Sequence, residues 1–158
     1  MANIAVIGKS GQVASALADV LPNAKFFGRN ELDLAAPDFN KLGKPDIVIN
    51  AAAYTAVDKA ETEVDLCIQI NSLAVAELAK YCAENNITLV HYSTDYVFNG
   101  AGNTAFLEDD LQNLQPLNVY GKSKLAGERA IIESGCEYYI LRTSWVYSFV
   151  GNNFVKTM

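Results

Sequence analysis

The sequence contains few residues of the kinds that build metal clusters or disulfide frameworks. Its 158 residues include one histidine and three cysteines, Cys67, Cys82 and Cys136, which are widely spaced and form no CxxC pair. This usage excludes a disulfide-stapled fold, a zinc site and a His-rich metal site. We therefore predict no metal site, and we expect the cysteines to be small buried side chains in a reducing cytoplasm.

Long apolar runs and basic runs are also missing. No segment approaches the ~18–20 apolar residues that span a bilayer, and the N-terminal MANIAVIGKSG lacks the charged leader and apolar length of a signal peptide. Twelve Lys and Arg oppose eighteen Asp and Glu, which gives a net charge of -6. We therefore expect a cytoplasmic protein that binds neither nucleic acid nor membranes. A helix N-terminus or a single arginine can still bind a phosphorylated small molecule.

The chain contains enough apolar sequence for one domain, since 51% of its residues are hydrophobic and 19% are charged. Short apolar runs alternate with amphipathic stretches. The runs predict strands over 4–7, 24–27, 46–50, 87–92 and 138–144, and the amphipathic stretches predict helices over 11–21, 63–84 and 119–132. Residues 54–61 are expected to form a loop. This alternation predicts an α/β, Rossmann-like fold, a doubly wound parallel sheet with helices on both faces.

Ligands of such sheets bind beyond the carboxyl ends of the strands, so the residues found there matter most. Gly8 and Gly11 follow the first strand in a GxxGxxA pattern that ends at Ala14. Such a turn suits a pyrophosphate at a helix N-terminus, and it is also compatible with an ordinary strand–helix loop. Arg29 follows the second strand, where an arginine favours the 2′-phosphate of NADP, unless it is a solvated surface residue.

Small and hydroxylated residues follow the next two strands. Ala51 to Ala53 could let a flat cofactor lie against the sheet, or could simply pack tightly. Ser93 and Thr94 lie where the fourth strand delivers side chains to a crevice. We interpret His91, inside that apolar strand, as a core histidine with satisfied hydrogen bonds rather than as a general base.

Tyr120 and Lys124 form the sharpest pair in the sequence. At a spacing of four residues on a helix they share one face and can touch the same ligand. A lysine ammonium beside a phenol lowers the phenol pKa toward a value useful for proton transfer. The pair taken alone is equally compatible with an exposed helix face.

The order and spacing of these features resemble the extended short-chain dehydrogenase/reductase family, and within it the dTDP-4-dehydrorhamnose reductases. The stretches that carry the resemblance span nearly the whole chain: GKSGQVA, INAAAYTAVDKAE, HYSTDYVFNG, PLNVYGKSKLAGE and RTSWVY with GNNF. The resemblance implies NADPH-dependent reduction of the 4-keto group of dTDP-4-dehydro-L-rhamnose to give dTDP-L-rhamnose. NAD(H) is a possible substitute cofactor, and a homodimer is a possible assembly.

The family pattern also implies roles for individual residues. Tyr120 would donate a proton to the carbonyl oxygen, and Thr94, or Ser93 beside it, would hydrogen-bond that oxygen. Lys124 would hold the nicotinamide ribose and lower the Tyr120 pKa. Besides Tyr120 and Lys124, the implied cofactor-binding residues are Gly8, Gly11, Gln12, Val13, Arg29, Asp33, Leu34, Ala51, Ala52, Ala53 and Asn71. The implied substrate-binding residues are Val57, Thr94, Asp95, Tyr96 and Trp145.

The chain departs from the family pattern in three respects. Ala14 replaces the usual third glycine of the turn. Ser15 and Ala16 occupy the region where some members carry a glutamate that helps bind magnesium, so no such site is expected. Family members are nearly twice this length, so we expect residues 1–158 to be the NAD(P)-binding domain with the catalytic pair, and the C-terminal substrate-binding domain to be absent. Another nucleotide-sugar epimerase or dehydratase, and a non-catalytic NADP-binding regulatory subunit, remain alternatives.

Overall fold

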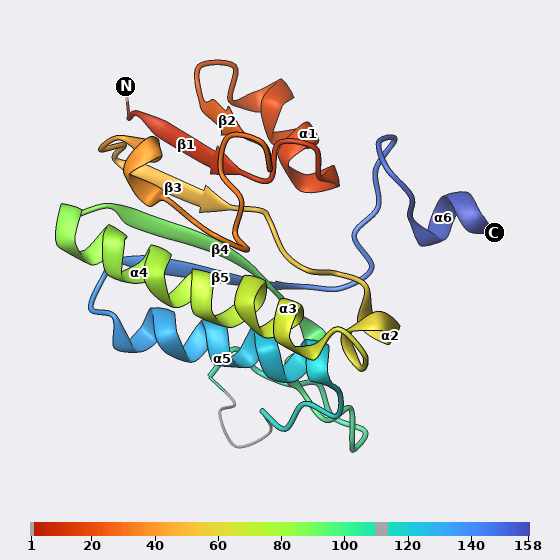
Figure 1. The fold of residues 1–158 in the computed structure, drawn as a ribbon. Coiled ribbons are helices and arrows are strands. Elements are labelled where there is room, and N and C mark those ends of the chain that lie inside the picture. The colour runs from red at the N-terminus through yellow and green to blue at the C-terminus, as the bar shows by residue number, and fades with distance from the viewer. Residues whose placement is uncertain (1, 110–113) are drawn as a thin grey trace.

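A five-stranded parallel sheet forms the centre of the molecule in a computed structural model that describes residues 2–109 and 114–158 (Figure 1). The strands are β1 (Ile4–Ile7), β2 (Lys25–Phe27), β3 (Ile47–Asn50), β4 (Thr88–Thr94) and β5 (Tyr138–Thr143). Their order is β2-β1-β3-β4-β5, and every neighbouring pair is parallel. The predicted doubly wound sheet is confirmed. The strand order reverses between β1 and β3, since β2 is added on one side of β1 and β3 on the other, and such sheets form a ligand crevice at this point.

Helices occupy the predicted positions, with two additions and one interruption. They are α1 (Gln12–Val20), α2 (Val57–Ala60), α3 (Val64–Ile68), α4 (Ala74–Asn85), α5 (Val119–Glu133) and α6 (Phe154–Thr157), and the additions are α2 and α6. The short helix α2 lies where a loop was expected, so that expectation was wrong. The helix expected over 63–84 is a continuous helical stretch in which a π-helical segment, Gln69–Leu73, joins α3 to α4. The π-helical turn lies beside the site described below, where such bulges are frequent.

Two apolar clusters fix the layers on either side of the sheet. On one face, α4 and α5 contribute Leu78 and Ile131 to a cluster with Val48 of β3 and Leu89 of β4. On the other face, α1 packs Ala14 against Val6 and Ile49. All three cysteines are buried and unpaired, as predicted.

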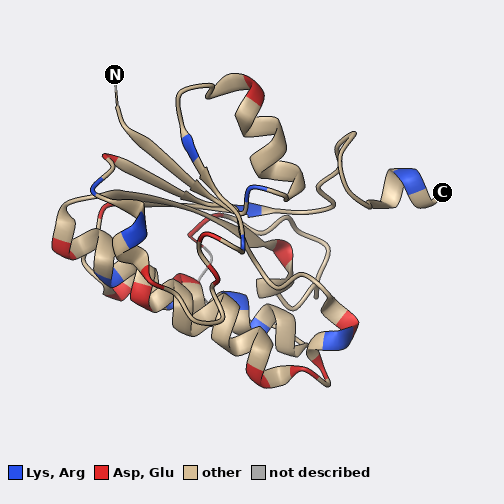
Figure 2. Ribbon diagram, turned by 45° about the horizontal axis from the view of Figure 1, so that its top comes forward, with Lys and Arg blue, Asp and Glu red and all other residues tan. Residues whose placement is uncertain are grey.

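The α1 side of the sheet is open along β5. Ile140 packs against the cluster formed with α4 and α5, so its neighbours Tyr139 and Leu141 point to the opposite face, where both are exposed. Lys and Arg are interspersed with Asp and Glu over the helices (Figure 2). Among the helices that the structure describes, none is both long and apolar enough to cross a bilayer.

Candidate active site

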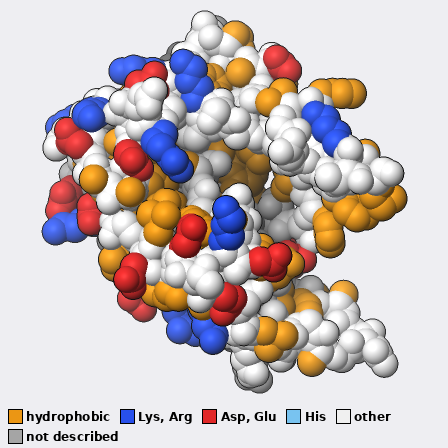
Figure 3. Space-filling model, turned by 45° about the vertical axis from the view of Figure 1, so that its right-hand side comes forward, with side chains coloured by type: hydrophobic (Ala, Val, Ile, Leu, Met, Phe, Trp, Pro, Cys, Tyr) orange, Lys and Arg blue, Asp and Glu red, His pale blue; other side chains and the backbone are white. Residues whose placement is uncertain are grey.

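A cleft of about 660 Å³ opens at the carboxyl ends of the strands, and it is visible as a hollow with apolar walls in Figure 3. This volume lies in the range of small-molecule sites, ~300–1,000 Å³. Nearly all of the predicted site residues line it: Gly8, Gly11, Gln12, Val13, Arg29, Asp33, Leu34, Ala51, Ala52, Ala53, Val57, Thr94, Asp95, Tyr96, Tyr120, Lys124 and Trp145. The fold thus gathers side chains that are up to 137 positions apart into one place.

Asn71 is the exception. Its side chain is buried in the π-helical segment, where Oδ1 accepts the Tyr54 N–H at 2.9 Å. Its Nδ2 donates to the Tyr54 carbonyl and to Ser123 Oγ, both at 3.0 Å. Asn71 therefore does not line the cleft, because its polar atoms tie Tyr54 to α5 instead, and its role in cofactor binding stays a prediction.

The glycine turn after β1 forms a cradle of backbone. Gly8 has a φ of +103°, and a Cβ on it would lie 2.9 Å from the Ala51 carbonyl group, so only glycine fits. The Gly11 N–H donates to the Gly8 carbonyl at 2.8 Å and closes the turn. Gly11 also caps α1 without any side-chain hydrogen bond. The N-terminal end of α1 therefore faces the cleft without a side-chain cap, a geometry suited to an anion.

In the segment after β2, Arg29 is the cationic side chain that lines the cleft. The neighbouring acidic side chains are engaged with backbone, since Glu31 Oε2 accepts the Gly28 N–H at 2.7 Å and Asp33 Oδ1 accepts the Ala35 N–H at 2.9 Å. Arg29 lines the cleft beside them. This end of the cleft therefore offers a cation to a ligand, while its nearest carboxylates are already hydrogen-bonded.

Tyr120 lies in the first turn of α5 because Asn118 caps that helix, its Oδ1 accepting the Gly121 N–H at 2.8 Å. The ring packs edge-on against Tyr96, with centroids 5.6 Å apart. Burial raises the pKa of Tyr120, and hydrogen bonding to Thr94 opposes that rise. The expectation that Lys124 lowers this pKa was wrong for the structure described here, because the lysine amine is held by other partners.

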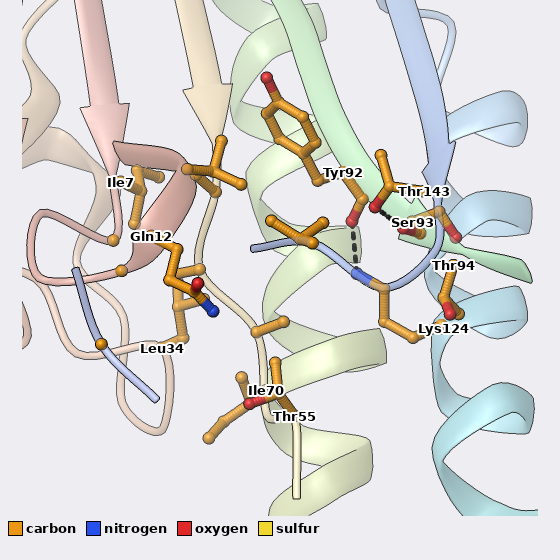
Figure 4. Close-up of a pocket in the computed structure, with 18 of the residues that line it drawn as sticks. Ile7, Gln12, Leu34, Thr55, Ile70, Tyr92, Ser93, Thr94, Lys124 and Thr143 are labelled. Atoms are coloured by element: carbon orange, nitrogen blue, oxygen red, sulfur yellow. Dashed lines mark hydrogen bonds between the residues drawn. The ribbon is translucent and has the colours of Figure 1, made fainter. Parts of the chain in front are cut away.

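Lys124 is almost completely buried, with 1% of its surface exposed. Its Nζ donates to the Tyr92 carbonyl at 2.6 Å (Figure 4) and lies 3.1 Å from Nε2 of His91. Burial lowers the pKa of Lys124 to about 8, although the nearby Glu128 and Cys67 act in the opposite direction. The amine is thus preorganised by β4 at the floor of the cleft.

Several contacts near the site could not be predicted from the sequence. His91 is a buried, hydrogen-bonded core residue, as predicted, but its contact with Asn50 could not be read from the chain. Ser93 lines the cleft with a buried hydroxyl that has no hydrogen-bond partner in the described part of the chain. Val146 and Gly151 also line the cleft. Residues 146–151 are distant in sequence from the glycine turn, and tertiary packing brings them to the wall of the cleft.

Comparison with known proteins identifies close relatives. The family model described as the RmlD substrate binding domain matches residues 2–158. The dTDP-4-dehydrorhamnose reductase of Escherichia coli (strain K12) is 45% identical over 167 residues, covering 99% of this chain and 55% of the relative. The crystal structure of dTDP-4-dehydrorhamnose reductase from Bacillus anthracis str. Ames in complex with NADP matches with a TM-score of 0.90 at 37% identity, covering 99% of this chain and 58% of that one. The ortholog from Clostridium acetobutylicum gives a TM-score of 0.88 at 37% identity, with 98% and 57% coverage. The chain therefore spans about half the length of these relatives.

Proposed function

Because this chain belongs to the RmlD substrate binding domain family, we propose that it forms the NADP(H)-binding and catalytic part of a dTDP-4-dehydrorhamnose reductase. The reaction is reduction of the 4-keto group of dTDP-4-dehydro-L-rhamnose to give dTDP-L-rhamnose. The observation that carries the proposal is the convergence of Thr94, Tyr120 and Lys124 with the Gly8 turn in a single cleft. Such a cleft can hold a dinucleotide and a carbonyl substrate side by side.

The residues of the cleft fit NADP(H). The Gly8–Gly11 turn gives the backbone close approach that a pyrophosphate needs, and Arg29 supplies a cation for a 2′-phosphate. The unpartnered buried hydroxyl of Ser93 gives a bound ligand one further hydrogen-bonding group. When bound, the cofactor supplies a hydride, and the protein supplies binding, orientation and a proton. Ala51 to Ala53 would line the cofactor on the β3 side.

Tyr120 would act as the proton donor. A raised pKa keeps its phenol protonated at neutral pH, which a donor to a developing alkoxide requires. The Thr94 hydroxyl would hydrogen-bond the same carbonyl oxygen and orient it toward Tyr120. Lys124 would hold the nicotinamide ribose, while Val57, Asp95, Tyr96 and Trp145 would contact the sugar.

The assembly and location of the protein belong to the same proposal. We retain residues 1–158 as the cofactor-binding domain, a homodimer as the assembly, and the cytoplasm as the location. The net charge of -6 disfavours nucleic acid as a partner.

The variant Tyr120→Phe tests this function in the intact protein. Loss of the phenolic proton should lower the rate of NADPH-dependent ketone reduction by about 10²–10⁴-fold. The affinity for NADPH, followed by fluorescence titration, should stay within about 2-fold because the ring remains. Tyr139→Phe is the matched control, since this tyrosine is exposed on β5 and should keep full activity.

Two results would contradict the proposal. Unimpaired turnover by Tyr120→Phe would show that the proton comes from another group. Binding of NADPH without any ketone reduction by the unmodified protein would favour a non-catalytic cofactor-binding subunit.

A further inference from the structure

The mechanism above leaves unused two buried polar side chains next to the reacting residues. Asn50 ends β3 and His91 lies directly opposite it on β4, where the two are paired in register. Asn50 Nδ2 lies 3.1 Å from His91 Nδ1, and His91 Nε2 lies 3.1 Å from Lys124 Nζ. Asn50 Oδ1 accepts the Ala52 N–H at 3.2 Å. These contacts form one unbroken chain, which we call the Ala52–Lys124 chain, from the backbone of the cleft wall to the catalytic lysine.

The direction of this chain follows from its backbone end. A peptide N–H can only donate, so the Ala52 N–H fixes Asn50 with its oxygen toward Ala52 and its NH₂ toward His91. Asn50 then donates to Nδ1, and the ring carries its hydrogen on Nε2. Burial and the nearby Lys124 hold the pKa of His91 well below its usual value, so the ring has only this one hydrogen. An Nε2–H that points at Lys124 Nζ needs a lone pair there, which only the neutral amine has.

The opposite direction requires every link to reverse. An ammonium on Lys124 donates to Nε2, so the ring hydrogen must be on Nδ1 and Asn50 must turn its oxygen toward His91. The Asn50 NH₂ then faces the Ala52 N–H, which loses its acceptor. The net change is one proton gained at Lys124, while the imidazole keeps a single hydrogen on its other nitrogen.

We propose that Asn50 and His91 are positioning residues that link the protonation of Lys124 to the hydrogen bonding of the Ala52 N–H. Ala52 lines the cleft, so a bound group that accepts its N–H favours the reversed chain and the ammonium form of Lys124. Cofactor binding thereby extends the ammonium form of Lys124 to higher pH. The cofactor part of this inference rests on the proposed function, whereas the linkage between Lys124 and the His91 tautomer does not.

The other groups that face Lys124 set the pH at which the hydrogen bonds of the Ala52–Lys124 chain reverse direction. Glu128 lies one turn further along α5 and forms an ion pair with Arg142, with Nη2 2.7 Å from Oε2. Cys67 of α3 is also close, and both groups favour the ammonium, whereas burial opposes it. The resulting Lys124 pKa of about 8 places the reversal within an accessible range of pH.

Nitrogen NMR of the imidazole tests the proposal directly. The protein has one histidine, so ¹⁵N-histidine labelling gives the signals of the His91 ring alone. Two-bond couplings distinguish the Nδ1–H tautomer from the Nε2–H tautomer. In the ligand-free protein we expect Nε2–H well above pH 8 and Nδ1–H well below it, with a midpoint near the Lys124 pKa of about 8. Saturating NADP⁺ should move the midpoint to higher pH.

Two variants separate the linkage from a merely structural role. Lys124→Met removes the titrating group, so the ring should keep the Nε2–H tautomer at every pH. Asn50→Asp offers oxygens to both Ala52 and His91, so it should hold the ring in the Nδ1–H form and abolish the switch. Near-ultraviolet circular dichroism confirms that each variant is folded.

A tautomer that does not change with pH in the unmodified protein, or that changes identically in Lys124→Met, would overturn the proposal. If NADP⁺ fails to bind but the pH-dependent switch is present, the proposed function fails while the linkage stands. If NADP⁺ binds without moving the midpoint, the linkage to Ala52 is wrong and the proposed function is unaffected.

Discussion

At the scale of single residues, Lys124 occupies an unfavourable place for a charge. Its aliphatic stem and amine are both enclosed, and its Nζ finds a carbonyl and an imidazole rather than a carboxylate in direct contact. Burial of a lysine without a directly bound anion favours the neutral form, which is the cause of its lowered pKa. The protein keeps this residue at a cost to stability, as functional sites commonly do.

That cost predicts how stability depends on pH. The folded state binds the Lys124 proton less tightly than the unfolded chain, so between about pH 8 and 10.5 the unfolded state carries more protons and stability rises with pH. Lys124→Met removes this dependence. The unfolding free energy of the unmodified protein, measured in urea, should therefore gain about 3 kcal/mol relative to Lys124→Met across this window. Lys122→Met, at an exposed position on the same helix, retains Lys124. Its unfolding free energy should therefore change with pH as that of the unmodified protein does. If the difference in unfolding free energy between Lys124→Met and the unmodified protein does not change between pH 8 and 10.5, Lys124 does not have the lowered pKa.

At the scale of elements, helix α5 is held by close backbone contacts on both sides of the catalytic turn. Gly121 lies against the Tyr96 carbonyl and Gly127 against the Asn71 carbonyl, each so near that a Cβ would overlap the oxygen. Ser123 accepts a hydrogen bond from Asn71, and Glu128 is clamped by Arg142 of β5. The helix therefore has little freedom to slide, which fixes Tyr120 and Lys124 relative to β4.

Gly121→Ala tests this packing. A glycine-to-alanine change inside a helix normally stabilises it by about 0.5–1 kcal/mol. Here the new methyl group would overlap the Tyr96 carbonyl oxygen and lie 2.9 Å from Pro116 Cβ, so we expect a loss of about 1–3 kcal/mol in urea unfolding. Ala126→Gly, at an exposed position of α5, calibrates the ordinary propensity effect and should cost about 1 kcal/mol. A Gly121→Ala protein as stable as the unmodified one would show that α5 does not pack this closely.

At the scale of the whole molecule, local sequence patterns predicted the strands and most helices. Contacts between residues distant in sequence determine the hydrogen-bond partners and the pKa shifts at the site. The strands could be predicted because runs such as IAVI bury both faces, and Tyr120 and Lys124 because helical spacing puts them on one face. The π-helical turn was not predicted, and its Asn71 amide bonds with Tyr54 and Ser123, partners that lie 17 and 52 positions away in the sequence. The partners of His91 and the raised pKa of Tyr120 likewise depend on burial and on neighbours from other elements.

The segment from Ser144 to Met158 illustrates such a long-range contact at this scale. It extends from β5 past the end of the sheet, with Phe149 fully exposed, yet it returns to the cleft at Gly151 (Figure 1). The Gln12 side chain contributes to this connection. Gln12 Oε1 accepts Asn153 Nδ2 at 3.0 Å and Ser148 Oγ at 3.3 Å. Gln12 Nε2 donates to the Asn152 carbonyl at 3.4 Å. The first residue of α1 thus tethers the segment beside the glycine turn.

Gln12→Ala should release this tether without unfolding the domain. We expect faster amide hydrogen exchange over 148–157, because the Gln12 hydrogen bonds are lost, and little change in the exchange of β1 or β4. The free energy of unfolding should fall by about 1 kcal/mol or less, as is usual for partly exposed hydrogen bonds. Trp145 is the only tryptophan in the sequence and lies in the same segment, so its fluorescence reports the same release independently. Asp19→Ala, at an exposed position of α1, is the control and should leave both signals unchanged. Unaltered exchange over 148–157 in Gln12→Ala would mean that the segment is held by its own contacts, such as the edge-on packing of Trp145 against Phe154 at 4.9 Å.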